Sequence, residues 1–245
     1  MNDGLKLSTK LIVMLSTLSM IILLSGPLGY KSEVLPLQPA LVLLIVALGT
    51  AGLAFIGSLI MLVLAIKADL IRNRNFLLMA LALSLVPTSL VGLQLKKAIT
   101  LPEIHDISTD ISTPPLFNKI VQLRKGAPND LVYEYKGSSK KLAELQLAAY
   151  PELKTIHSHL TVTAAIERVV TVLNELGLDI VHVDQNEGLV EATATTYWYA
   201  FKDDVVVRIK ARDQGSLIDL RSVSRVGRSD VGANAARIMA FSSRF

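Results

Sequence analysis

The stretch LIDLRSVSRVGRSDVGANAARI, residues 217–238, combines a strand, a turn and the start of a helix. Its first part belongs to a run from Ser216 to Arg225 whose composition and period predict a strand. Gly227 favours a tight turn. Beyond the turn, apolar residues recur at the spacing of one helix face: Val231, Ala235, Ile238 and Met239. The stretch therefore predicts the last strand and the last helix of a mixed domain.

The polar residues of this stretch have a structural interpretation. Arg221 and Arg225 share one face of the predicted strand, and Arg228 falls in the turn. Asp230 is expected at the N-cap, where its carboxylate accepts hydrogen bonds from first-turn amides and interacts favourably with the helix dipole. Asn234 is expected on the flank of the helix, away from its apolar stripe. In this interpretation the polar residues of the motif stabilise the turn between the last strand and the last helix.

A competing interpretation is an anion site. The amides at the start of the helix would bind a phosphate or carboxylate together with Arg221, Arg225, Arg228 and Ser229. Asp230 argues against this site, because its carboxylate already occupies the position of the anion. The sequence thus favours the structural interpretation.

The residues before the motif predict the rest of a compact α+β domain over residues 151–245. A short strand lies in KTIHSHLTV, residues 154–162, and a helix capped by Thr163 ends at Gly177. Four further strands are predicted at Leu178–Val183, Leu189–Phe201, Val205–Arg212 and Ser216–Arg225. Their short separators predict an antiparallel meander, and the order is β-α-β-β-β-β-α.

The predicted strands have one apolar and one polar face. Val190 and Ala192 alternate with Glu191, and Val205 and Val207 lie opposite Asp204 and Arg208. The alternation includes Trp198 and Ala200 on the apolar face. We expect two helices to cover the apolar face.

Residues 98–150 lack a clear period and contain several prolines, so we predict an extended connecting arm that packs onto the domain. Its tandem DIST, residues 106–113, is rich in side chains that cap turns. A cation site formed by His105, Asp106 and Asp110 is the less favoured alternative, because these residues follow no cation-binding pattern. No metal or cofactor site is predicted, and the chain has no cysteine.

Residues 1–97 predict a membrane anchor. The whole chain is 51% apolar with a mean hydropathy of +0.47, and three apolar runs cover about 11–28, 40–66 and 76–95. Each run is long enough, or nearly long enough, to cross a membrane as a helix, and none contains an ionisable side chain. A cleaved signal peptide is a less favoured reading of the first run. The absence of buried charge disfavours a transporter or a channel.

Basic residues in the short loops predict the orientation of this anchor. One side has five of them, at Lys6, Lys10, Lys67, Arg72 and Arg74, and the other has three, at Lys31, Lys96 and Lys97. The larger group is expected in the cytoplasm. With three spans, the C-terminal domain then lies in the periplasm of a bacterium, and the anchor lies in the inner membrane.

The second span contains Gly49, Gly52 and Gly57 among other small residues, a pattern that allows another helix to approach closely. It predicts helix docking within the chain or with a partner subunit. The ordinary glycine content of membrane helices is the slightly favoured explanation of the pattern.

The sequence also resembles a known family, domain of unknown function 1499, of bacteria and plastids. The resemblance is carried by EATATTYWYAFKDDVVVRI, residues 191–209, and by IDLRSVSRVGRSDVGANAARI, residues 218–238, and more loosely by IHDISTD and AAYPELK. It covers roughly Pro102 to Phe241. It implies a compact α+β domain, often preceded by membrane helices or an export signal, without an established activity. No catalytic residue can be carried over.

No nucleophile motif, metal motif or phosphate-binding glycine loop is present, so the sequence favours a non-catalytic protein without a cofactor. Acidic neighbours of the aromatic cluster at residues 197–199 disfavour nucleic-acid binding. The preferred function is an accessory or assembly subunit of a membrane or envelope complex, whose partners are membrane lipids and other membrane subunits. The alternative is a periplasmic domain that binds, or hydrolyses, an anionic or lipid ligand at the arginine motif.

Overall fold

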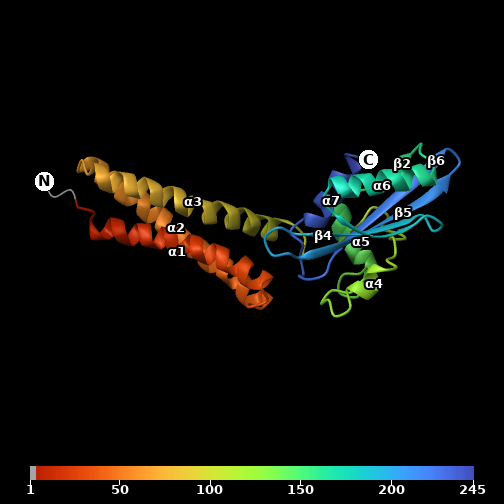
Figure 1. The fold of residues 1–245 in the computed structure, drawn as a ribbon, viewed down its shortest axis with the longest axis horizontal. Helices are drawn as coiled ribbons and strands as arrows, with labels where there is room; N and C mark the ends of the chain where they lie inside the picture. The colour runs from red at the N-terminus through yellow and green to blue at the C-terminus, as the bar shows by residue number, and fades with distance from the viewer. Residues whose placement is uncertain (1–3) are drawn as a thin grey trace. The chain divides into compact units, whose positions relative to one another are not determined.

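A computed structural model describes residues 4–245, and the chain divides into two compact units at Lys96–Lys97 (Figure 1). The N-terminal unit consists of α1 (Leu7–Lys31), α2 (Leu37–Lys67) and α3 (Ile71–Thr100). All three are long and apolar enough to cross a membrane, which makes them candidate spans. Each begins before and ends after the apolar run predicted from the sequence, because the flanking polar residues continue the helix.

Small side chains bring α1 and α2 together. Along α2, Ala47, Ala51, Ala54 and Ser58 are fully buried, and they recur at spacings of three and four residues, which places them on one face. A second contact joins the beginnings of α1 and α3. The Asn73 Oδ1 atom accepts hydrogen bonds from the Lys6 backbone nitrogen at 2.9 Å and from the Thr9 hydroxyl at 2.8 Å. The starts of α1 and α3 therefore lie at the same end of this unit.

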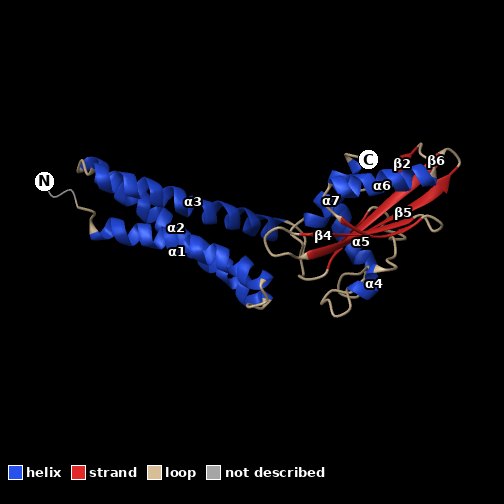
Figure 2. Cartoon of the chain, in the orientation of Figure 1, coloured by secondary structure: helices blue, strands red, loops and turns tan. Residues whose placement is uncertain are grey.

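The C-terminal unit is an antiparallel sheet with helices, so the predicted α+β class is confirmed (Figure 2). Its strands are β1 (Asp106–Ser108), β2 (Ile156–Ser158), β3 (Asp179–Asp184), β4 (Leu189–Thr195), β5 (Lys202–Arg212) and β6 (Gly215–Ser224). Its helices are α4 (Ile120–Leu123), α5 (Ser139–Ala149), α6 (Val162–Glu175) and α7 (Ala233–Ser242).

The sheet is built around β6. The strand order is β1-β6-β5-β4-β3, and the short β2 also pairs with β6. β1 and β2 occupy different parts of the same edge of β6, since Asp106 lies opposite Val223 and Ile156 lies opposite Ile218. The predicted meander corresponds to β3 to β6, whose short separators form hairpins.

The apolar face of the sheet carries the hydrophobic core. Val190, Ala192, Val205, Val207 and Ile209 point into it, as the alternation predicts. α6 and α7 cover this face (Figure 1). Burial of these side chains is the main stabilising contribution of the domain.

The polar face is also buried, and the segment predicted as a connecting arm covers it. Glu191 and Asp204 have no exposed surface, and Arg221 has 1%. Residues 97–150 belong to the C-terminal unit and supply β1, α4 and α5 instead of a separate arm. The segment shows no clear period because it is attached by backbone groups, by single polar side chains and by scattered apolar residues such as Ile104, Ile107 and Leu142, which do not recur at a regular spacing. Glu191, for example, accepts hydrogen bonds from the backbone nitrogens of Asn118 at 2.6 Å and Lys119 at 2.8 Å.

Gln146 of α5 closes the edge of the sheet at β1. Its Oε1 accepts a hydrogen bond from the Ser108 nitrogen at 2.9 Å, and its Nε2 donates to the Ser108 carbonyl at 2.6 Å. The fully buried amide thus takes the place of a neighbouring strand. Such protection prevents an edge strand from pairing with another chain.

β4 ends at Thr195, six residues before the end predicted from the sequence. Thr196 reverses the chain, because its hydroxyl accepts a hydrogen bond from the Phe201 nitrogen at 2.9 Å. Trp198 and Ala200 therefore lie in the loop between β4 and β5, not on the apolar face of a strand. The loop is rich in aromatic residues, which are common in strands, and for that reason the sequence pattern overestimates the strand.

Candidate functional site: the arginine motif

Arg221 of β6 is held by the segment that covers the sheet. Its Nε and Nη2 atoms donate to the two carboxylate oxygens of Asp106, at 3.0 and 2.6 Å. The remaining donors reach the backbone carbonyls of Pro115 at 3.2 Å and Leu131 at 2.8 Å. The rings of Phe117 and Tyr133 lie 5.6 and 5.4 Å from the guanidinium carbon. Every nitrogen of this guanidinium thus has a partner within the fold.

Arg225 shares one carboxylate with a second arginine. Its Nε and Nη2 both donate to Asp204 at 2.8 Å, and Arg124 Nη1 donates to the same carboxylate at 3.1 Å. The Thr193 hydroxyl completes four hydrogen bonds to Asp204 at 2.8 Å. Burial lowers the pKa of Arg124, and the charge of Asp204 offsets part of that effect. Asp204 therefore neutralises positive charge that would otherwise be buried without compensation.

A third ion-pair group lies further along the same face. Arg208 Nη2 is 2.9 Å from both Asp110 and Asp219. Asp110 also accepts bonds from the backbone nitrogens of Ser112 at 3.0 Å and Thr113 at 2.9 Å. Burial raises the pKa of Asp110, but these hydrogen bonds outweigh it, and the pKa lies below its ordinary value. The turn chemistry of the tandem DIST is thus used to attach the segment to β5 and β6.

Asp230 binds the amides at the start of α7, but from outside the N-cap position. Its carboxylate accepts hydrogen bonds from the Gly232 nitrogen at 2.8 Å and the Asn234 nitrogen at 2.9 Å. The N-cap itself is Gly232, which adopts a left-handed conformation with φ of 83°. Burial raises the pKa of Asp230, and the two amide hydrogen bonds counteract the rise. Ser229 makes a similar local contact, since its hydroxyl accepts from the Val231 nitrogen at 3.1 Å.

Asn234 is fully buried against the sheet and not on an exposed flank. Its amide nitrogen donates to the His105 carbonyl and the Ser224 hydroxyl, both at 2.9 Å. Its oxygen accepts from the Ser222 hydroxyl at 2.6 Å and from Arg237 at 2.7 Å. Asn234 therefore joins α7 to the end of β6 and to the residue before β1. The sequence predicts Asn234 on the flank of the helix away from the apolar stripe, and the structure shows that this position is buried as well.

Arg228 differs from the other motif arginines, because its side chain is exposed and does not contact Asp230. Within residues 4–245 its guanidinium has no ion pair or hydrogen bond, and only its backbone carbonyl interacts, 3.3 Å from His105 Nδ1. The six candidate residues thus separate into two groups. Five of them interact within the corner or with the covering segment, and Arg228 faces solvent.

The less favoured cation site finds no support in these contacts. Asp106 and Asp110 bind Arg221 and Arg208, and the carboxylates do not converge on a common position. Residues 4–245 contain no group of three or more acidic, histidine or cysteine side chains arranged to hold a metal ion.

Several partners of the motif could not be recognised in the sequence. Asp106 and Asp204 bind Arg221 and Arg225 across 115 and 21 residues of sequence, and Arg237 pairs with Asp203 at 2.7 Å. For Asp204 the only sequence signal is its place on the polar side of a predicted strand, whereas Asp106 lies in the predicted arm and Asp203 lies before that strand. That signal identifies a candidate ion pair but not its partner.

The glycines of α2 face in two directions. A Cβ atom on Gly57 would lie 3.5 Å from Ile12 Cδ1 of α1, whereas Cβ atoms on Gly49 and Gly52 would have nothing within 4 Å. Gly57 therefore serves the packing of α1 on α2. The outer side of α2 at Gly49 and Gly52 is lined by exposed apolar side chains, including Leu53 and Ile56.

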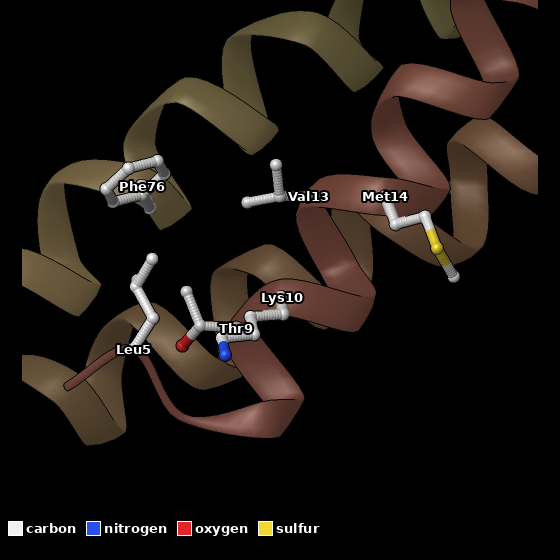
Figure 3. A pocket seen from close by; sticks show the side chains of 6 residues that line it. All are labelled: Leu5, Thr9, Lys10, Val13, Met14 and Phe76. Atoms are coloured by element: carbon white, nitrogen blue, oxygen red, sulfur yellow. The ribbon is translucent and has the colours of Figure 1, made fainter.

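A shallow hollow lies near the beginnings of α1 and α3 (Figure 3). It is lined by Leu5, Thr9, Lys10, Val13, Met14 and Phe76. Four of these six side chains are apolar, and none of the lining residues within the described range 4–245 is acidic or a histidine. In a bilayer, the acyl chains of the lipids would solvate such an apolar surface.

Comparison with known proteins places this domain in a family. The model of a protein family of unknown function, DUF1499, matches residues 106–245. The chain belongs to this family. The DUF1499 match begins at Asp106, the partner of Arg221, and includes all six strands, whereas α1 to α3 lie outside it. No curated protein and no solved structure matches the chain.

Proposed function

We propose that the chain is a non-catalytic, membrane-anchored accessory or assembly subunit of a membrane or envelope complex. In this proposal α2 docks against a helix of another membrane protein, and the C-terminal domain is a rigid module held beside that complex. The anchor lies in a bacterial inner membrane with its N-terminus in the cytoplasm and its domain in the periplasm.

The observation that carries the proposal is the internal use of the arginine motif. An anion could reach Arg221 only by displacing Asp106, and it could reach the Nε and Nη2 atoms of Arg225 only by displacing Asp204. Both carboxylates are buried and hydrogen-bonded. Removing one partner of a buried ion pair leaves an uncompensated charge and is strongly unfavourable. The motif thus supports the rigidity of the domain better than it supports a ligand or a reaction.

The outward side of α2 supports the docking part of the proposal. Helices associate in membranes through small residues, because backbones can then approach closely. Gly49 and Gly52 have open space beside them, unlike Gly57. A facing helix could therefore contact the α2 backbone without displacing side chains of α1.

The test is purification of the tagged full-length chain in a mild detergent, with measurement of the mass of the complex. A stoichiometric membrane protein should co-purify with the wild type and be lost in Gly52→Leu. Gly92→Leu in α3 is the matched control, because a side chain there also meets nothing within 4 Å. The control should retain the partner. A chain that purifies alone, or a partner that persists in Gly52→Leu, contradicts the proposal.

A further inference from the structure

One end of the sheet follows closely in sequence on the third apolar helix. α3 ends at Thr100, and β1 begins at Asp106. The Ser224 nitrogen donates to the His105 carbonyl, and the Arg225 nitrogen donates to the Lys202 carbonyl, both at 3.0 Å. The start of β1, the start of β5 and the end of β6 therefore lie together. We refer to this end, marked by His105, Lys202 and Ser224, as the helix-proximal end.

An exposed aromatic pair lies at the helix-proximal end. The loop Thr196–Phe201, here the aromatic loop, joins β4 to β5 where Thr195 pairs with Lys202. Within it Tyr197 is 87% exposed and Trp198 is 39% exposed. Large aromatic side chains that are exposed next to each other on one loop can mark a contact surface.

The aromatic loop is held in a defined conformation. The Thr196 carbonyl accepts a hydrogen bond from the Ala200 nitrogen at 2.9 Å, and the rings of Tyr199 and Phe201 stack with centroids 5.0 Å apart. Ala200 has a φ of 52°, a conformation that is unfavourable for alanine. The fold thus maintains local strain in a loop that presents Tyr197 and Trp198 outward, and such strain is concentrated at functional sites.

Basic side chains accompany the aromatic pair. Arg228 and Lys202 are exposed, and both belong to the helix-proximal end, because the Arg228 carbonyl lies 3.3 Å from His105 Nδ1. The internal ion pairs of the motif leave Arg228 available for an external anion.

We propose that the aromatic loop and Arg228 contact the headgroup layer of the membrane that α1 to α3 cross. Tyrosine and tryptophan are enriched at this layer, where an apolar ring and a polar edge are both accommodated. Arginine contributes attraction to lipid phosphates. The connection to α3 limits the distance between the helix-proximal end and the bilayer. The proposal rests on the membrane spans and is independent of the assembly role.

Trp198 provides a direct test, because it is the only tryptophan of the chain. The full-length protein is placed in nanodiscs of phosphatidylcholine and phosphatidylglycerol. Fluorescence quenching is measured with lipids that carry a nitroxide close to the headgroup and with aqueous iodide. We expect the nitroxide lipid to remove most of the Trp198 emission and iodide to remove little.

The matched control moves the tryptophan to the opposite end of the same sheet. Trp198→Phe combined with Gln214→Trp places the probe in the exposed hairpin between β5 and β6. Iodide should quench this probe, and nitroxide lipid should not. In a second variant, Tyr197→Ser with Arg228→Gln, quenching of Trp198 should shift from lipid towards iodide while the melting temperature is retained.

Two results would overturn the proposal. The first is strong iodide quenching of Trp198 in nanodiscs, with no effect of the nitroxide lipid. The second result combines two observations. Iodide again quenches Trp198 in nanodiscs, but in native membranes a maleimide does not label the thiol of Tyr197→Cys. The second result would assign the aromatic loop to a protein partner instead of the lipid.

Discussion

Arg221 and Arg228 lie only seven positions apart, and they differ in what surrounds them. Arg221 is 1% exposed and binds Asp106 through two hydrogen bonds, whereas Arg228 is exposed. A buried charge that loses its partner retains its full desolvation penalty, but an exposed charge remains solvated by water. The same residue type therefore has a structural role at one position and remains available for contact at the other.

This contrast predicts the stability of the two alanine variants. Arg221→Ala should lower the free energy of unfolding of the C-terminal domain by about 3–5 kcal/mol, because Asp106 is left buried without a counter-charge. Arg228→Ala should change it by less than about 0.5 kcal/mol. Denaturation of the full-length protein in detergent, followed by Trp198 fluorescence, measures both.

Arg221→Lys keeps the prediction testable if the alanine variant does not fold. Lysine retains the charge but cannot form the two parallel hydrogen bonds to Asp106. The free energy of unfolding of Arg221→Lys should therefore lie between those of the wild type and Arg221→Ala. Equal stability of the Arg221 and Arg228 variants would contradict the structural role of Arg221.

Asp110 predicts a pH dependence at the residue scale. Its pKa in the fold lies below the ordinary value of 3.8, because hydrogen bonds from Thr113, Ser112 and Arg208 outweigh the effect of burial. A lowered pKa contributes stability above the unfolded-state value, and the contribution is lost as pH falls through the folded-state value. Asp110→Asn should therefore destabilise the domain at about pH 6, and the loss should become smaller as pH falls below 3.8 and through the lowered pKa of folded Asp110.

Thermal unfolding of wild type and variant at several pH values measures this difference. Glu134→Gln is the control, because Glu134 is exposed and its side chain makes no hydrogen bond within residues 4–245. A difference between wild type and Asp110→Asn that stays constant from acid to neutral pH would show that the ion pair with Arg208 contributes nothing.

At the scale of the elements, the hairpin between β3 and β4 depends on a close backbone approach. Gly188 has a φ of 62°, and an added Cβ would collide with the Ile209 carbonyl of β5. Its own carbonyl accepts a hydrogen bond from the Ile209 nitrogen at 2.7 Å. Gly177, at the end of α6, has a similar φ of 74° but open space around it.

The two glycines separate conformational strain from steric overlap. Gly177→Ala should destabilise the domain by about 1–2 kcal/mol, the usual cost of a left-handed alanine. Gly188→Ala should cost about 1–3 kcal/mol more, because β5 must also move. Urea denaturation monitored at Trp198 provides both values, and similar losses for the two variants would argue against a tight contact between the β3–β4 hairpin and β5.

The elements differ in how well the sequence predicts them. The meander β3 to β6 and the helices α6 and α7 have local periods, with Val190 or Val205 alternating with charged neighbours, and these were predicted. The segment that covers the polar face, residues 97–150, is held by single contacts between residues far apart in the sequence, such as Asp106 with Arg221. A local period contains no information about such a pair. The arginine motif could therefore be located from sequence, but its carboxylate partners could not.

At the scale of the whole molecule, the predicted membrane orientation rests on the positions of the basic residues. The contact of Asn73 with Lys6 and Thr9 holds the starts of α1 and α3 at one end of the N-terminal unit. Five basic residues flank this end, namely Lys6, Lys10, Lys67, Arg72 and Arg74, against Lys31, Lys96 and Lys97 at the other. Basic residues are retained in the cytoplasm, so the predicted orientation has the start of α3 inside and its end outside.

The absence of cysteine makes this orientation directly measurable with single thiols. Gln214→Cys lies in the exposed β5–β6 hairpin, and Ala68→Cys lies in the exposed link between α2 and α3. In spheroplasts, a membrane-impermeant maleimide should label Gln214→Cys at once and Ala68→Cys only after the membrane is permeabilised. The reverse pattern would place the C-terminal domain in the cytoplasm. The assembly partner would then have to be sought there, while the contact of the aromatic loop with its own bilayer would be unaffected.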